Sequence, residues 1–137
     1  MEYDDPAARL GEDECRRLLA TVPVGRVVYT ERALPAVLPV AFEVAPDGRL
    51  LLALRAGCAA ARALDGTVAA FQADLVDPVT RTGWSVLVHG RAHVLREPPA
   101  AAGARGGGAP GAGVALTPEL VAGRRLGPSA VRSPADK

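Results

Sequence analysis

The segment 81–96, which reads RTGWSVLVHGRAHVLR, constrains the fold more than any other part of the chain. Its residues alternate between two apolar-rich sets with a period of two, which is typical of a β-strand. Gly90, near the middle, predicts a bulge or a close approach by another backbone or a ligand. We therefore expect one long strand at the centre of a small barrel, with Trp84 and Ser85 at its functional end.

The remaining sequence predicts five more strands and two short helices, separated by short turns. The predicted strands are 24–31, 37–44, 49–55, 67–77 and 114–126, the last interrupted near Pro118. The predicted helices are 12–20, with acidic residues in its first turn, and 58–64. Pro39 has no amide hydrogen to donate, so its strand should be at an edge or bulged there. Short connections favour antiparallel pairing, and a closed or partly closed barrel accommodates these strands in so short a chain. The predicted fold class is mainly β.

A length of 137 residues is sufficient for one domain with a hydrophobic core. We expect that domain to span residues 10–126. Residues 1–9 are expected to be a disordered lead-in, and 127–137 a disordered tail. The Gly/Ala/Pro-rich run 100–113 is expected to be a flexible loop inside the domain.

Composition and charge argue against several functional classes. The formal net charge is +1 and no basic patch is concentrated in the sequence, which argues against a nucleic-acid partner. No apolar run reaches the roughly 18 residues of a membrane-spanning helix, and the acidic start MEYDDPAARL is unlike a secretory signal. Cys15 and Cys58 show no metal-binding or redox spacing. We therefore expect a cytoplasmic protein without a membrane partner, a metal or a disulfide.

Several motifs together resemble one known family. These are ECRRLLATVPVGRVVYT, LPAVLPVAFEV, LRAG, VAAFQADLVDPVTRTGWSVLVHGRA and, more weakly, the terminal GRRL. As a set they resemble the pyridoxamine 5′-phosphate oxidase-like family, whose fold is the FMN-binding split β-barrel. The resemblance covers about residues 10–97 and resumes over 114–126. It implies a homodimer with FMN in a groove at the interface and a small-molecule substrate bound over the flavin ring.

The resemblance also implies roles for particular residues. The backbone at Pro39 and Val40 would lie along the flavin ring, and Trp84 and Ser85 would approach the ring or the ribityl chain. Arg124 or Arg125 would reach the site from the partner chain. The residues implied around the FMN phosphate are Arg55, Gly57 and Cys58, with Arg62 nearby.

The phosphate-binding segment departs from the family pattern. Relatives often carry R-T-x-x-G-S-K-L after the third strand, whereas this chain has Ala56, Cys58 and Ala59 at the Thr, Ser and Lys positions. A hydrogen bond to a charged group contributes about 1.5–3 kcal/mol, so the missing donors should weaken FMN binding by several powers of ten. Arg55, Arg62 and the start of the second helix would compensate in part.

Two hypotheses from different classes follow. The first is a flavin-dependent oxidoreductase with FMN, or with the deazaflavin F420 as the alternative cofactor. No catalytic dyad or triad is visible, which suits a protein whose cofactor carries the redox chemistry. The second is a degenerate split-barrel binding or interaction module without a redox cofactor. In that case Trp84 would be a core or interface aromatic, Ser85 an ordinary strand residue and Arg62 part of a solvated helix face.

Overall fold

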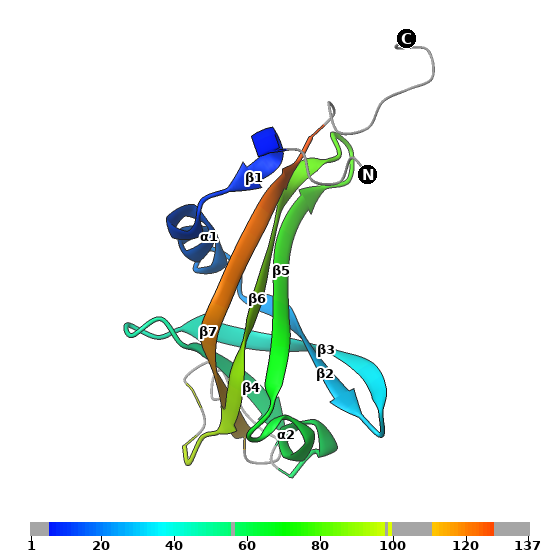
Figure 1. Cartoon of the computed structure of the whole chain (residues 1–137), viewed down its shortest axis with the longest axis vertical. Coiled ribbons are helices and arrows are strands. Elements are labelled where there is room, and N and C mark those ends of the chain that lie inside the picture. The colour runs from blue at the N-terminus through cyan, green and yellow to red at the C-terminus, as the bar shows by residue number, and fades with distance from the viewer. Residues whose placement is uncertain (1–5, 56, 98, 100–110, 128–137) are drawn as a thin grey trace.

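In the computed structural model, six strands close into a ring, and the described residues are 6–55, 57–97, 99 and 111–127. The strand order around the ring is β7-β4-β3-β2-β5-β6, with β6 pairing back to β7 and the short β1 added along β7. All pairs are antiparallel. Figure 1 shows β5, β6 and β7 running along the length of the molecule, with β2 and β3 crossing them. The prediction of an antiparallel split barrel is confirmed.

The element boundaries are close to those predicted. The strands are β1 (Arg9–Leu10), β2 (Val24–Glu31), β3 (Leu34–Val44), β4 (Leu50–Arg55), β5 (Val68–Asp77), β6 (Thr82–Val94) and β7 (Gly111–Leu126). The helices are α1 (Glu12–Leu19) and α2 (Ala59–Leu64), preceded by a short 3-10 helix at Pro6–Ala8. Among the described residues, neither α-helix has the length and apolar character to cross a membrane.

Two expectations about segment boundaries need adjustment. Residues 6–9, expected in a disordered lead-in, contain the 3-10 helix and the first residue of β1, because Arg9 pairs with Arg124 of β7. The expected loop 100–113 ends earlier, since β7 already begins at Gly111 through its pairing with Arg55. The rest of that loop (100–110), the start of the lead-in (1–5) and the tail 128–137 lie outside the described residues.

The bulge predicted at Gly90 is present. The register between β6 and β7 shifts after His89, so that His89 faces Leu120 while Gly90 faces Pro118. The backbone of β7 approaches closely here: a Cβ added at Gly90 would lie 1.9 Å from the carbonyl oxygen of Thr117. The same irregularity accounts for the predicted interruption of the final strand near Pro118.

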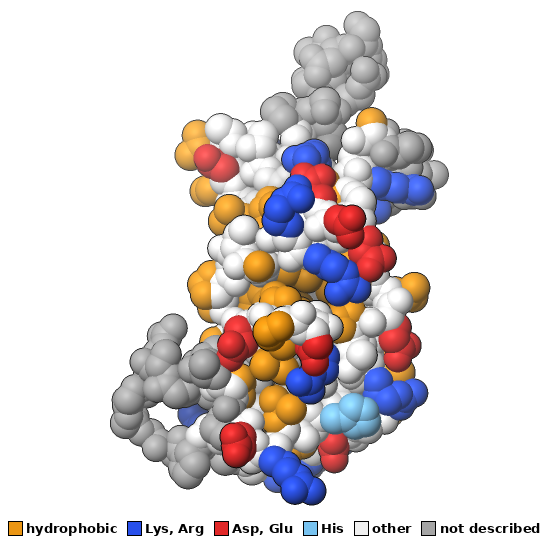
Figure 2. Space-filling model, turned by 90° about the vertical axis from the view of Figure 1, so that its left-hand side faces the viewer, with side chains coloured by type: hydrophobic (Ala, Val, Ile, Leu, Met, Phe, Trp, Pro, Cys, Tyr) orange, Lys and Arg blue, Asp and Glu red, His pale blue; other side chains and the backbone are white. Residues whose placement is uncertain are grey.

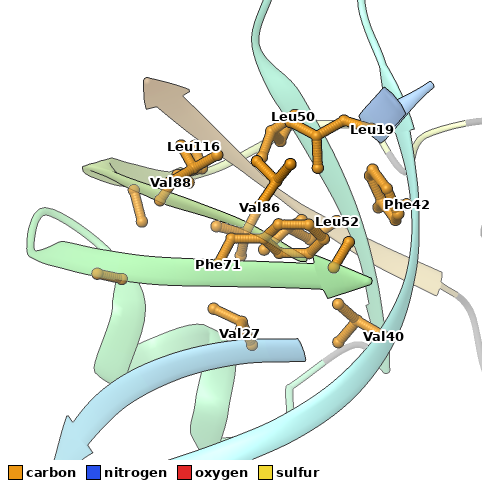
Figure 3. Packing of buried hydrophobic residues seen from close by; sticks show 14 of the residues in the cluster. Leu19, Val27, Val40, Phe42, Leu50, Leu52, Phe71, Val86, Val88 and Leu116 are labelled. Carbon is orange, nitrogen blue, oxygen red and sulfur yellow. The ribbon is translucent and has the colours of Figure 1, made fainter. Parts of the chain in front are cut away.

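The hydrophobic core fills the ring of strands. Phe71 of β5 is fully buried, and its ring contacts Phe42 of β3 at a centroid distance of 4.7 Å and an interplanar angle of 60°. Figure 3 shows these rings surrounded by aliphatic side chains from β2, β4, β6 and β7. On β6 the inward residues are Trp84, Val86, Val88 and Ala92, as the period-two alternation requires.

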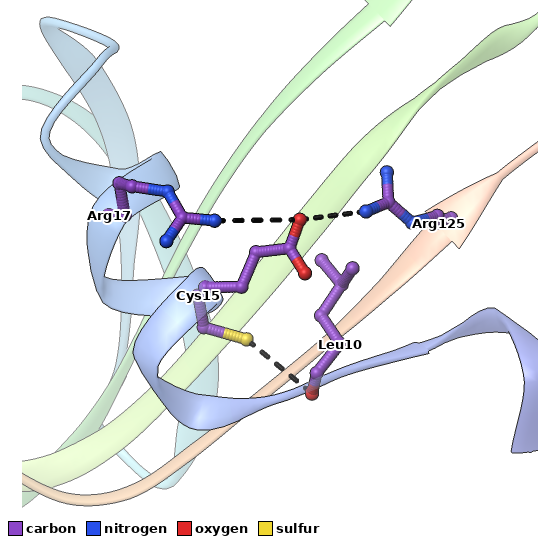
Figure 4. A network of polar contacts seen from close by, with 5 residues as sticks. Leu10, Cys15, Arg17 and Arg125 are labelled. Carbon is purple, nitrogen blue, oxygen red and sulfur yellow. Dashed lines mark hydrogen bonds and ion pairs between the residues drawn. The ribbon is translucent and has the colours of Figure 1, made fainter.

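Helix α1 covers the inner face of β6 and β7 at one end of the barrel. Cys15 is fully buried against Gly123, where an added Cβ would lie 2.6 Å from the thiol sulfur. Burial, reinforced by the charge of Glu14, raises the pKa of the Cys15 thiol, so the thiol stays protonated. Figure 4 shows the outer side of this contact, where Glu14 accepts a 2.7 Å hydrogen bond from Arg125 of β7.

The turn between β2 and β3 offers a test of stability. Arg32 and Ala33 have φ angles of 53° and 65°, a left-handed conformation that disfavours side chains other than glycine. We expect Ala33→Gly to raise the free energy of unfolding by about 0.5–1 kcal/mol, after the entropy that glycine adds to the unfolded chain. Urea unfolding measures the change. The matched control Ala36→Gly, inside β3, should be destabilising; equal effects of both substitutions would contradict the interpretation.

Candidate functional site

The outer face of the sheet brings together residues from five strands. In the register, Pro39 of β3 pairs with Arg26 of β2, and Arg26 pairs with Gln72 of β5. Gln72 in turn pairs with Leu87 of β6, which pairs with Ala122 of β7. Paired residues point to the same face, so these five side chains form one row across the sheet. Pro39 lies where β3 has no partner on its other side, because its pairing with β4 starts at Ala41.

A hydrogen-bond network lies in the middle of this row. Arg26 donates to the side-chain oxygen of Gln72 at 3.2 Å, which orients the amide group. The Gln72 amide nitrogen then donates to Asp74 at 2.8 Å and to the hydroxyl oxygen of Ser85 at 3.2 Å. Arg26 also lies 3.8 Å from the Asp74 carboxylate. Because the Ser85 oxygen accepts a hydrogen bond, its own hydrogen remains available for donation.

Ser85 borders a hollow of about 560 Å³ on the outer face. The floor is apolar and includes Leu87 and Ala122, and the polar rim is formed by Gln72 and Ser85 on one side and by Arg9 and Arg124 on the other. This volume is within the range of small-molecule sites, and a mainly apolar surface with a few polar groups is typical of them.

A second hollow, of about 180 Å³, lies on the α1 side of the molecule between that helix and the β3–β4 turn. Its lining is mainly apolar and includes Leu19, Pro46 and Val121. Figure 2 shows apolar side chains gathered in the middle of this side, with charged side chains around them. None of the residues predicted to bind a cofactor lines this hollow.

Trp84 and Ser85 point to opposite faces of β6. Trp84 is 8% exposed and belongs to the hydrophobic core, while Ser85 is half-buried at the outer hollow. Neighbouring residues of a strand alternate between faces, which explains the division. The structure therefore brings Ser85, and not the indole, to the outer face.

A similar division holds on β3. Pro39 is exposed on the outer face with Ser85, whereas the side chain of Val40 is buried in the core. Pro39 and Ser85 are three strand spacings apart, on the order of 14 Å along the curved sheet. Of the predicted ring contacts, these two therefore share one face.

The residues predicted around a phosphate lie at the α2 end of the molecule. Arg55 is exposed at the end of β4, and Gly57, with a φ of 73°, turns the chain into α2. Cys58 is half-buried at the N-terminal cap of α2. Arg62 donates a 2.6 Å hydrogen bond to the carbonyl oxygen of Gly57, so its guanidinium holds this loop.

Tyr29 of β2 lies near this α2 end. Burial raises the pKa of the Tyr29 phenol, and the charge and hydrogen bond of Glu31 and the nearby Cys58 add to the effect. The phenol therefore remains a neutral hydroxyl at neutral pH. In Figure 1 the α2 end lies at the bottom of the molecule, opposite the end where β1 pairs with β7.

Sequence reasoning missed part of this site. Arg26 was readable from the sequence, because it alternates with the inward residues of the predicted strand 24–31. Gln72 and Asp74 were placed on one face of their strand without a role. Arg9 gave no signal, since only the pairing of β1 with β7 brings it beside Arg124.

Comparison with known proteins supports a family assignment. The sequence profile of the family described as pyridoxamine 5′-phosphate oxidase matches residues 11–125. Rv0080, a protein of Mycobacterium tuberculosis, is 46% identical over 94 residues, which make up 65% of this chain. The match spans 61% of the length of that relative.

Solved structures with the same fold include two described as FAD-binding proteins. The protein from Mycobacterium smegmatis is 28% identical with a TM-score of 0.68, and the match covers 85% of this chain and 95% of that one. The protein from Mesorhizobium loti is 23% identical with a TM-score of 0.66, covering 86% and 95%. At that identity the second likeness concerns the fold alone. Since the family profile extends over most of the sequence, the chain belongs to the pyridoxamine 5′-phosphate oxidase family.

Proposed function

We propose that the protein binds a flavin on the outer face around Ser85, in a groove completed by a second copy of the chain. A small-molecule substrate would bind over the flavin ring. The observation that carries the proposal is the oriented network Arg26–Gln72–Ser85 beside an apolar floor, on the same face as Pro39. Family membership and the FAD-binding protein from M. smegmatis support it.

The residues on this face suit a flat, partly polar ring system. Leu87 and Ala122 offer an apolar surface, and Ser85 retains a hydroxyl hydrogen to donate to a ring or ribityl oxygen. Arg26 fixes the Gln72 amide, and Gln72 in turn fixes Ser85, so the donor is held in place before a ligand binds. Trp84 would act from the opposite face, by packing the strand that carries Ser85.

Exposed apolar side chains support a second copy as the cover of this face. Val37 on β3 is 60% exposed and Leu120 on β7 is 67% exposed, and both lie on the same outer face as Pro39. Large exposed apolar groups on one surface are typical of interaction sites. A homodimer would bury them and would remove water from the flavin groove.

The phosphate end fits less well than the ring end. Arg55 is exposed and available as a cation, but Arg62 is already engaged by the Gly57 carbonyl. Cys58 and Ala59 supply neither the hydroxyl nor the ammonium group that relatives often carry there. FMN binding should therefore depend mainly on the ring and on Arg55.

The flavin, when bound, would supply hydride or electron transfer at its N5 atom. The protein would orient the ring through Ser85 and the backbone at Pro39, and would exclude water through the dimer contact. No side chain is assigned a proton-transfer role. FMN, FAD and F420 are the cofactors to compare.

The alternative function is a split-barrel binding module without a redox cofactor. The specific observation in its favour is the side-chain chemistry of the α2 loop, where Cys58 and Ala59 stand in place of phosphate donors. Under this alternative the outer face would serve association alone.

Cofactor titration of the purified protein separates the two functions. We expect flavin fluorescence to be quenched on binding, and Ser85→Ala to weaken the affinity about five- to tenfold, the equivalent of one hydrogen bond. The control Thr30→Ala, at the far end of β2, should bind like the wild type. Light scattering should report a dimer, which Leu120→Asp converts to a monomer with loss of flavin binding. A monomeric protein that binds neither FMN, FAD nor F420 would leave the alternative.

A further inference from the structure

A pair of arginines at the edge of the outer hollow forms a basic site that the sequence does not reveal. Arg9 of β1 and Arg124 of β7 are directly opposite in the register, and both line the hollow that Ser85 borders. Directly paired residues on neighbouring strands point to the same face, so the two guanidinium groups share one side of the sheet.

This arrangement places like charges next to each other. Like charges directly opposite on neighbouring strands are destabilising, and an anion between them would reverse the sign of that interaction. Among the described residues that line the hollow there is no aspartate or glutamate. The nearby Asp74 already accepts a hydrogen bond from Gln72 and lies 3.8 Å from Arg26, on the opposite side of the network.

Ser85 adds a neutral donor to the same hollow. Its oxygen accepts from Gln72 at 3.2 Å, and its hydrogen is therefore available to a ligand that also reaches the arginines. Two forked guanidinium groups and a hydroxyl form a donor set suited to phosphate or carboxylate oxygens.

From this geometry we infer that Arg9, Arg124 and Ser85 form an anion-binding subsite for a phosphate- or carboxylate-bearing group, separate from the Arg55 end. The subsite extends the proposed flavin site, and the source of its anion rests on that proposal. The anion is either the diphosphate of a dinucleotide flavin or the acidic group of a separate small molecule bound over the ring.

Thermal unfolding of the full chain with inorganic pyrophosphate tests the subsite without any flavin. We expect millimolar pyrophosphate to raise the Tm of the wild type by a few degrees, because a ligand that binds only the folded state stabilises it. The double variant Arg9→Gln/Arg124→Gln should lose this shift. The control Arg17→Gln removes an arginine of α1 outside the hollow and should keep it. No shift in the wild type, or an equal shift in the double variant, would overturn the inference.

Flavin titrations then identify the source of the anion. If the wild type prefers FAD over FMN and the double variant loses this preference, the diphosphate of the flavin occupies the subsite. If the preference is the same in both proteins while the pyrophosphate shift is lost, the subsite serves a separate acidic ligand. Pyrophosphate binding through the arginines without flavin binding would sustain the subsite and remove the proposed flavin function. Flavin binding without any pyrophosphate effect would do the reverse.

Discussion

Gly90→Ala is expected to lower the free energy of unfolding by about 3 kcal/mol. A Cβ at this position would lie 1.9 Å from the carbonyl oxygen of Thr117 and 2.7 Å from its carbonyl carbon, both of them backbone atoms. Relief requires β6 and β7 to separate, and overpacking of a tight contact typically costs about 1–3 kcal/mol, sometimes more. Because these strands share the longest pairing in the barrel, the cost should be at the upper end. Urea unfolding followed by circular dichroism measures it.

Gly127→Ala provides the matched control for this substitution. Nothing lies within 4 Å of a Cβ built at Gly127, so the same change there should leave the midpoint unchanged. If Gly90→Ala proved as stable as the control, the close approach of the two backbones at the bulge would be wrong. The register shift that positions Ser85 relative to Arg124 would then need revision as well.

The double substitution Cys58→Ser/Ala59→Lys is expected to raise FMN affinity about 100-fold or more. It restores a hydroxyl at the cap of α2 and an ammonium group at the exposed first residue of that helix. Each hydrogen bond to the phosphate should contribute about 1.5–3 kcal/mol, and 1.4 kcal/mol corresponds to a tenfold change in affinity. Titration followed by quenching of flavin fluorescence gives the dissociation constants.

Riboflavin, which lacks the phosphate, is the control ligand for the double substitution. Its affinity should be the same in both proteins if the new groups act on phosphate alone. Ala20→Lys, which adds a lysine at the end of α1, is the matched control variant and should not change FMN binding. An equal gain for riboflavin and FMN would show that the substitutions act through the fold, since serine also caps helices better than residues without an oxygen.

The fold was largely predictable because the strands alternate clearly. The segment 81–96 gave β6, and its glycine gave the bulge. The start of β3 was predicted three residues late, at Val37, because Pro35 suggested a turn. Pro35 instead pairs with Thr30 in a hairpin whose tight turn uses two residues with positive φ and no glycine. Such a turn has no sequence signature, so its position could not be predicted.

The candidate site was less predictable than the fold. Alternation shows which residues share a strand face, and it was sufficient to separate Trp84 from Ser85. It does not show which strands lie side by side, so the link from Arg26 through Gln72 to Ser85 required the pairing of β2 with β5. The Arg9–Arg124 pair depends on two segments at opposite ends of the chain. Arg62 had the right charge for a phosphate, but a backbone carbonyl in its own loop engages it.

The position of β7 in the ring has a consequence for biosynthesis. This strand pairs with β6 along nearly its whole length on one side, and with β4 and then β1 on the other. It also follows all of them in the chain. A nascent polypeptide emerging from the ribosome therefore presents β4 and β6 with unpaired backbone edges until Gly111–Leu126 has been translated. Chaperone binding to stalled chains should accordingly fall sharply once the stall site moves far enough beyond Leu126 for this segment to leave the exit tunnel.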